Sequence, residues 1–405
     1  MTNSEPSEIW DLAQAWKPVV TGDEAAMTDA YEAARSRCPV QRVQLPNGAS
    51  FWAVIAKKEL EEVLNKPDVF SNAVANFNTA PRIPLELDPP VHGSYRRMLN
   101  RFINPSVAAL LEPEIRRYVV EELEPFMANG GGDLVPLAAK IPLRVLCKLL
   151  GAPEEDWKVI FDTQTALVPA DSVNVKEGAA AARFALLKPV TDYALLLIER
   201  RKAQPGDDLV SKLLAATVDE RVLTEEEVFR VIVLLLLAGH ETTKSAMGGS
   251  AYLLTQHPTI QQKLRADPSL IPQAVEECLR LHAPVQGMNR FAKQDIEIAG
   301  ITIKEGDQVI PVFGAANMDE AAFECPALFS LDRKPNHHFT FGRGIHMCIG
   351  APIARMEIKV FMEELLSRTS NIELNDDVER ANWPEVSFRH LNIRVAPAQS
   401  KGESL

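Results

Sequence analysis

Hydrophobic positions recur at helical spacing through most of residues 92–280, with a break at the glycine run 130–132. The most distinctive segment of this region begins at Thr224, a capping residue that is followed by glutamates in the first turn of a predicted helix. The pattern allows this helix to run to about Gln256. Its middle, VIVLLLLAG, is apolar on every side, so we expect the helix to cross the core.

Shorter segments predict strands. Residues 41–55 contain two β-rich runs around an Asn-Gly turn, which is typical of a hairpin. Residues 295–313 alternate between apolar and polar positions, and FRHLNIRV near the C-terminus is another β-like run. Residues 66–90 are rich in Pro, Asn and Ala and predict a long loop. We find no internal repeat or long linker, so we expect a single domain over residues 1–405, mainly α with a smaller β portion.

Composition excludes several classes of function. The 405 residues carry 43 Lys and Arg against 55 Asp and Glu, a formal net charge of −12, so nucleic acid is not an expected partner. The start of the chain lacks the pattern of a secretory signal. The longest aliphatic stretch, Val231 to Ala238, is far shorter than the roughly 20 residues of a membrane span. We therefore expect a cytoplasmic protein without a membrane segment, and the five scattered cysteines argue against structural disulfides.

One of these cysteines lies in a glycine-rich frame. The segment FGRGIHMCIG surrounds Cys348 with three glycines, and a helical run follows at once. A thiolate there would lie at a helix N-terminus, where backbone N–H groups and the helix dipole stabilise negative charge. The glycines would let the backbone approach a flat cofactor. Two alternatives are a structural cysteine in a turn and a zinc site with His337, His338 and His346, although a second cysteine and a paired-ligand spacing are missing.

An acid and an alcohol lie within the predicted apolar helix, at Glu241 and Thr242. Such groups are costly in an apolar core unless they are satisfied or used. The small residues Ala238 and Gly239 would leave room for a flat ring or O₂, and a threonine within a helix can bond back to a carbonyl and loosen the helix locally. A buried polar pair at a kink is the structural alternative.

Together these segments resemble the cytochrome P-450 family, with a likeness that extends from about residue 50 to the C-terminus. The resemblance implies that haem b lies between the long central helix and the cysteine loop, and that the sulfur of Cys348 holds the iron. It also implies that further residues lie against the haem: Phe341, Gly342, Gly350, Ala238 and Gly239.

The same resemblance implies that Glu241 and Thr242 supply protons for cleavage of the O–O bond of O₂. One oxygen atom would then enter the substrate and the other would leave as water. Lys244 lies three residues beyond Glu241, and a salt bridge between them would hinder this proton delivery. The pattern assigns no function to Lys244.

Two more sets of residues match the family. Glu277 and Arg280 match its Glu-x-x-Arg pair, which locks onto an arginine ahead of the cysteine loop, here Arg333, in a buried structural trio. Haem propionates need cationic donors, and four candidates match the family's positions: His92, Arg96, Arg290 and His346.

The expected substrate pocket is mostly apolar, and core packing explains each of its residues equally well. Its candidate residues come from the loop, the long helix and the segment after Arg280: Phe77, Ile83, Leu234, Leu237, Ala238 and Val285. This lining suggests a small hydrophobic substrate, such as a terpenoid or an alkyl aromatic. The sequence identifies neither the substrate nor the carbon attacked.

The resemblance implies an oxidoreductase, a monomeric monooxygenase that hydroxylates, epoxidises or oxidatively dealkylates its substrate. The sequence shows no flavin, nicotinamide or iron–sulfur motif, so a separate ferredoxin with its reductase is the expected electron source. Its docking face should be the cysteine side, with basic contacts from Arg96, Arg97, Arg343 and Arg355. Two alternatives remain open: a peroxide-driven peroxygenase, which usually lacks the acid–alcohol pair, and a non-catalytic haem sensor or carrier, which would need an output domain.

Overall fold

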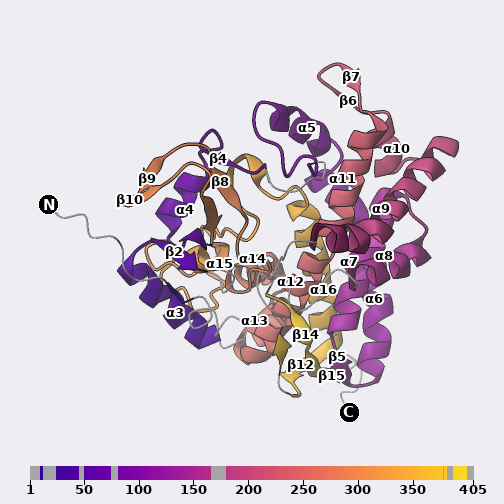
Figure 1. Cartoon of the computed structure of the whole chain (residues 1–405). Coiled ribbons are helices and arrows are strands. Elements are labelled where there is room, and N and C mark those ends of the chain that lie inside the picture. Colours follow the sequence, from indigo (N-terminus) through magenta and orange to yellow (C-terminus); the bar gives the residue numbers. More distant parts are fainter. Residues whose placement is uncertain are drawn as a thin grey trace, which may run out of the picture.

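The computed structural model describes residues 10–11, 24–44, 50–73, 81–165, 179–376, 378–380 and 386–398. Helices dominate, as the hydrophobic pattern predicts, and Figure 1 shows most of them gathered on one side of the molecule. The helices are α3 (Glu24–Arg37), α4 (Lys57–Leu64), α5 (Val91–Asn100), α6 (Pro105–Ala128), α7 (Val135–Leu150), α8 (Trp157–Thr165), α9 (Ala179–Ala203), α10 (Leu209–Leu214), α11 (Glu225–Ala238), α12 (Glu241–Gln256), α13 (Pro258–Ala266), α14 (Ile271–Leu281), α15 (Phe313–Asn317) and α16 (Ala351–Arg368).

Part of the smaller β portion lies on the other side, beside α3 and α4, and the rest lies among the helices (Figure 1). Its largest sheet has the strand order β1-β2-β3-β11-β8-β4. These strands are β1 (Trp10–Asp11), β2 (Val40–Gln44), β3 (Ser50–Val54), β11 (Gln308–Pro311), β8 (Arg290–Ala292) and β4 (Phe70–Ser71). The antiparallel pairing of β2 with β3 confirms the hairpin predicted within residues 41–55.

Smaller sheets complete the β portion. They are β9 (Ile296–Ile298) with β10 (Ile301–Ile303), β12 (Thr369–Leu374) with β15 (Asn392–Pro397) and β5 (Gly131–Asp133), β13 (Glu379–Arg380) with β14 (Phe388–His390), and β6 (Thr217–Val218) with β7 (Arg221–Val222). The first and third of these confirm the strands predicted at 295–313 and in FRHLNIRV. Among the described residues, no helix is both long enough and apolar enough to span a bilayer.

The predicted long helix is interrupted, which corrects the expectation of one helix from Thr224 to about Gln256. Its start is as predicted, because Thr224 and Glu227 form a reciprocal capping box at the N-terminus of α11. However, α11 ends at Ala238, and α12 begins at Glu241. The hydroxyl of Thr242 donates to the Ala238 carbonyl oxygen at 3.3 Å, so a side chain takes a partner at the point where the helical ladder breaks.

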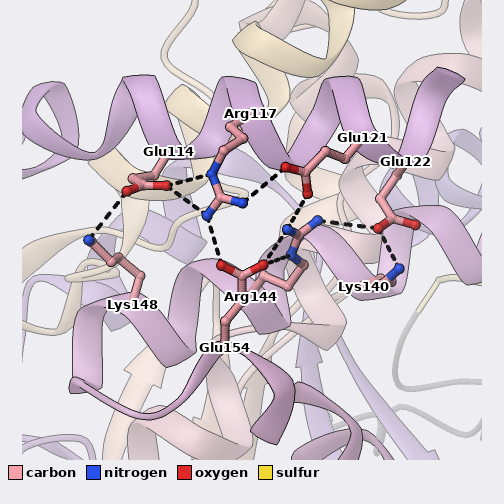
Figure 2. Close-up of polar contacts among 8 residues, drawn as sticks. All are labelled: Glu114, Arg117, Glu121, Glu122, Lys140, Arg144, Lys148 and Glu154. Atoms are coloured by element: carbon pink, nitrogen blue, oxygen red, sulfur yellow. Dashed lines mark hydrogen bonds and ion pairs between the residues drawn. The ribbon is translucent and has the colours of Figure 1, made fainter.

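A network of alternating charges joins α6 to α7 and to the short 3₁₀ helix η1 (Glu154–Asp156). Figure 2 shows Arg117 and Arg144 between glutamates, with a lysine near each end of the row. Arg144 is buried, bonds to Glu121 and Glu154, and lies 4.1 Å from the ring centroid of Tyr118. Every cation in this network therefore faces a carboxylate of the same chain.

Candidate functional site

Cys348 lies in a loop that closes on itself just before α16. Its backbone N–H donates to the carbonyl of Phe341 at 2.8 Å. The 3₁₀ helix η3 (Gly344–His346) lies between these two residues. At Gly344 φ is +72°, and a Cβ there would lie 2.6 Å from the carbonyl oxygen of Leu64, so glycine alone fits this position. The loop brings the thiol to the first turn of α16, which begins at Ala351.

The electrostatic surroundings of Cys348 act in two directions. The residue is exposed, but protein atoms surround its sulfur. The resulting desolvation is the largest influence on the thiol, and it raises the thiol pKa. The backbone N–H groups of Gly350 and Ala351 and the charges of Arg96 and Arg355 lower that pKa. These four groups would stabilise a thiolate, and a bound metal ion would complete its deprotonation.

The start of the cysteine loop is fixed by contacts that the sequence analysis missed. The Arg355 guanidinium lies 4.4 Å from the ring centroid of Phe341 and donates to Glu276 at 2.7 Å. His338 lies 3.2 Å from the same carboxylate. Burial would raise the pKa of Glu276, but its bonds to His338 and Arg355 lower the value to about 2. Two adjacent glutamates at 276 and 277 were the available sequence signal for a second pairing here.

The zinc alternative gains no support from this arrangement. His338 is engaged with Glu276, and His337 is exposed. Within the described part of the chain, no group of three or more His, Cys, Asp or Glu side chains is arranged to hold a metal ion.

The four candidate propionate ligands come from three separate elements, and burial together with their charges lowers the pKa of the two histidines among them. His92 and Arg96 lie on α5, Arg290 begins β8, and His346 ends η3. The imidazole centroids of His92 and His346 are 4.3 Å apart. Burial lowers the pKa of His346 to about 3, and repulsion by His92, Arg290 and Arg96 contributes to this value.

The basic cluster consists of histidines and arginines without a carboxylate of its own. Among the described residues, none of its four members forms an ion pair with a carboxylate, and the buried Nε2 of His92 has no hydrogen-bond partner. Asp88 acts on His92 and Arg290 electrostatically, but its carboxylate already accepts bonds from Ser71 Oγ at 2.5 Å and Asn72 N at 2.9 Å. Burial lowers the pKa of Arg290 to about 10. A ligand with two carboxylates fits such a cluster, as the propionates of haem would.

The acid–alcohol pair lies at the break between α11 and α12. Lys244 Nζ bonds to Glu241 Oε1, which is the salt bridge that the sequence raised as an obstacle. His240 Nε2 lies 3.5 Å from the other carboxylate oxygen of Glu241. The carboxylate therefore leans toward Lys244 and His240, whereas the Thr242 hydroxyl faces the Ala238 carbonyl.

His240 is a buried polar residue that the sequence analysis did not single out. It is 2% exposed, and its Nδ1 has no hydrogen-bond partner. Burial lowers its pKa to about 4; the charge of Glu241 raises this pKa and the charge of Lys244 lowers it. The imidazole is therefore neutral at pH 7. The signal available in the sequence was a histidine directly before the acid, at the end of an apolar run.

The trio Glu277, Arg280 and Arg333 is brought together. Glu277 and Arg280 are each at most 1% exposed, and Arg280 donates to both carboxylate oxygens, at 2.7 and 2.9 Å. Arg333 Nε donates to Glu277 Oε1 at 3.1 Å. Removing one partner would leave an uncompensated charge in the core.

The candidate pocket residues differ in their surroundings. Ala238 is exposed, Leu237 and Val285 are half-buried, and Leu234 is 9% exposed. Ile83 packs into the core cluster that contains Tyr95 and Met98. Phe77 lies outside the described residues.

Comparison with known proteins gives one consistent family. The family model described as Cytochrome P450 matches residues 181–393. The chain is 34% identical over 382 residues to "Cytochrome P450 130" of Mycobacterium tuberculosis (strain ATCC 25618 / H37Rv), which covers 90% of this chain and 93% of that protein. It is also 34% identical over 361 residues to "Mycinamicin IV hydroxylase/epoxidase" of Micromonospora griseorubida, covering 86% of this chain and 89% of the relative.

A solved structure agrees with these relatives. A mutant of P450 EryK in complex with erythromycin B superposes with a TM-score of 0.84 at 31% sequence identity, covering 95% of this chain and 99% of that chain.

Proposed function

This chain belongs to the cytochrome P450 family and is a monooxygenase that uses haem b and O₂; we propose that Cys348 binds its haem iron and that Glu241 and Thr242 control proton delivery. The observation that carries the assignment of Cys348 is its position in a closed glycine loop at the first turn of α16, with four groups that favour the thiolate. The reaction would be hydroxylation, epoxidation or oxidative dealkylation within one catalytic domain.

The bound haem supplies O₂ activation and the transfer of one oxygen atom to the substrate. The chain's own residues hold the cofactor in this proposal. The basic cluster of His92, Arg96, Arg290 and His346 binds the two propionates, which provide the counter-charge that the cluster lacks. Phe341, Gly342 and Gly350 would hold the loop against the ring on one side, and the small Ala238 would leave space on the other. Gly239 does not add to this space, because a Cβ there would lie 2.7 Å from the Leu235 carbonyl oxygen.

Glu241 and Thr242 perform the proton transfers in this proposal. The carboxylate of Glu241 is held by Lys244 and faces His240, while Thr242 lies at the adjacent position of α12. When the bond to Lys244 opens, the Glu241 carboxylate would take up a proton from water and turn toward the Thr242 hydroxyl. That hydroxyl would accept the proton while it passes its own proton into the site. Lys244 thus limits how often Glu241 is available, which would link proton delivery to a local rearrangement at the helix break.

We propose a small hydrophobic substrate, with a terpenoid or an alkyl aromatic as the first candidates. The support is the apolar character of Leu234, Leu237 and Val285, together with the exposed Ala238 beside the acid–alcohol pair. One relative is named as a hydroxylase/epoxidase of mycinamicin IV, and one solved structure of the family holds erythromycin B.

We propose that a cytoplasmic ferredoxin, reduced by its own reductase, supplies the electrons. Two of the four candidate arginines are already occupied, since Arg343 bonds to Glu61 and Arg355 bonds to Glu276. Arg97 donates to Ser94 Oγ and has no ion pair with a carboxylate of the described chain. The exposed Ile345 and Met347 directly precede the cysteine, so an acidic partner with an apolar centre would fit this face.

The proton-delivery proposal is tested by coupling measurements. A ligand screen that follows the Soret band first selects a substrate from a panel of terpenoids and alkyl aromatics. With that substrate, Glu241→Gln and Thr242→Ala should lower product formed per O₂ consumed, and Glu241→Gln should slow product formation by about 100-fold. Thr243→Ala, which removes the adjacent buried hydroxyl, is the matched control and should stay close to the wild type. Unchanged coupling in both Glu241→Gln and Thr242→Ala would rule out the proposed role.

The peroxygenase alternative is separated by the oxidant. Turnover with NADH, a ferredoxin and its reductase should exceed turnover with hydrogen peroxide for the wild type. Turnover by peroxide alone, unaffected by Glu241→Gln, would favour the peroxygenase.

A further inference from the structure

A hairpin and a helix start converge on α5, the helix that carries His92 and Arg96. The hairpin consists of β6 and β7, and Figure 1 shows it above the start of α11, next to α5. Ser94 Oγ donates to Asp219 Oδ1, in the turn of the hairpin, at 2.8 Å. The next residue, Tyr95, is 5% exposed, and its hydroxyl donates to Glu227 in the first turn of α11.

Arg221 of β7 closes this arrangement. It donates to both carboxylate oxygens of Glu227, at 2.5 and 2.8 Å, and to the Tyr95 hydroxyl oxygen at 3.1 Å. Its bonds to Glu227 lower the pKa of that carboxyl to about 2. Glu227 also accepts the backbone N–H of Thr224 at 2.7 Å as part of the capping box. One carboxylate therefore connects α5, the hairpin and the N-terminus of α11.

The hairpin turn places a glutamate, Glu220, at a position that glycine usually occupies. Asp219 and Glu220 have φ values of +48° and +67°. Turns of this hand are usually made by Asn-Gly or Asp-Gly, because other residues are strained there. This turn directs Asp219 toward Ser94 and Arg221 toward Glu227. Backbone strain that is kept at such a contact point indicates a function for the contact.

The helix that receives these bonds needs external support. α5 has 10 residues, and its N-cap residue, Pro90, makes no side-chain cap. Helices of this length are marginal on their own. The same helix presents His92 and Arg96, one helical turn apart, to the basic cluster.

We propose that Ser94, Tyr95, Asp219, Arg221 and Glu227 form a positioning clamp, the α5 clamp, which holds α5 so that His92 and Arg96 stay on the haem propionates. This inference rests on the proposed role of the basic cluster. The clamp residues do not touch the cofactor; they act through α5. By way of Glu227, the clamp also fixes the start of the helix that leads to Ala238 and the acid–alcohol pair.

The chain contains a matched control elsewhere. Tyr193 of α9 is 6% exposed and donates to Asp156 Oδ2 at 2.9 Å, and Arg200 donates to the same oxygen at 2.9 Å. This is the same combination of a buried tyrosine, a carboxylate and an arginine, but none of its members lies on an element of the candidate haem site.

The test compares Tyr95→Phe with Tyr193→Phe in the holoprotein by following haem transfer to excess apomyoglobin. Loss of one hydrogen bond to a charged group should make haem release from Tyr95→Phe about three- to tenfold faster, with Arg221→Gln in the same direction. Tyr193→Phe should release haem within about twofold of the wild type even if urea unfolding shows equal destabilisation. Hydrogen–deuterium exchange should show faster exchange of the α5 amides in Tyr95→Phe and unchanged α5 exchange in Tyr193→Phe.

Two results would overturn the clamp: wild-type haem release and α5 exchange in Tyr95→Phe, or equal acceleration in Tyr193→Phe. Arg96→Gln separates this inference from the function on which it rests. If Arg96→Gln speeds haem release and Tyr95→Phe does not, the clamp alone is wrong. If Arg96→Gln and His92→Gln both leave haem release unchanged, the propionate assignment is wrong.

Discussion

Two charged clusters of this molecule are built on opposite principles. The network between α6 and α7 (Figure 2) alternates arginines with glutamates, so that Arg117 and Arg144 share Glu121 and Glu154. The basic cluster at α5, β8 and η3 gathers His92, Arg96, Arg290 and His346 without an ion-paired carboxylate among the described residues. Both contain a buried arginine, and burying a charge is costly unless it is compensated.

The difference shows which cluster is complete as folded. The α6–α7 network satisfies its charges within the chain, so its contribution belongs to stability. Burial lowers the pKa of both His92 and His346, so Arg96 and Arg290 carry the charge of the basic cluster, and a bound anion would compensate it. In the proposed function, the haem propionates are that anion.

The largest loss of unfolding free energy should come from Arg144→Leu. The Arg144 side chain is 6% exposed, and its loss leaves Glu121, Glu122 and Glu154 facing one another. We expect the free energy of unfolding to fall by about 3 kcal/mol. Urea unfolding measures this loss, while the rate of haem release should stay at the wild-type value. A change in haem release comparable to that of a basic-cluster variant would remove the distinction between the clusters.

Arg290→Gln should have the reverse pattern. Without the guanidinium, haem release should be faster by about tenfold or more, because a charge-assisted bond to a propionate is lost. The stability of the haem-free protein should stay equal or rise, because an uncompensated buried cation disappears. Urea unfolding of the haem-free protein and haem transfer to apomyoglobin give the two values. A haem-free variant that is strongly destabilised would mean that the chain itself compensates Arg290.

Acid should weaken the α6–α7 network specifically. Hydrogen bonds from Arg144 to Glu121 and from Arg117 to Glu154 lower the pKa of each carboxyl in the folded state. The stability that they contribute is present above the unfolded value of about 4.5 and is lost as the pH falls through the folded values. The stability difference between wild type and Arg144→Leu should therefore narrow below about pH 4.5. A difference that is constant from pH 7 to pH 3 would contradict this origin.

Arg117→Gln should have the smallest effect. Its side chain is 43% exposed, and exposed pairs are screened by solvent. We expect a loss of unfolding free energy of less than about 1 kcal/mol, which 1 M salt should reduce further. A loss as large as that of Arg144→Leu would show that the network acts as one unit rather than around its buried member.

The sequence was sufficient where chemistry is encoded by spacing along the chain. The glycine frame of Cys348 is a local pattern that predicted a loop before a helix, and the structure has this loop before α16. The capping box at Thr224 is another, and it predicted the start of α11. The family resemblance also predicted a contact between residues far apart along the chain. Arg333 Nε lies 3.1 Å from Glu277 Oε1, as it implied.

Other features were identified from local patterns only in part or not at all. The sequence indicated that a threonine could loosen the long helix, and the Thr242 hydroxyl does bond to the Ala238 carbonyl, but apolar periodicity continues across the break and does not mark where α11 ends. His240 and Lys244 share Glu241 only once the helix has restarted. Arg343 pairs with Glu61, and Arg355 pairs with Glu276. These partners lie far apart along the chain, so the sequence did not indicate that the two arginines are neutralised.

The most direct measurement of the central claim is the Soret band of the reduced, CO-bound protein, compared between wild type and Cys348→Ala. The account predicts the long-wavelength Soret band of thiolate ligation in the wild type and its loss in Cys348→Ala. Cys325→Ala, which removes the other exposed thiol, should keep the band. A wild type without this band, or a Cys348→Ala variant that retains it, would show that Cys348 is not the ligand of the haem iron.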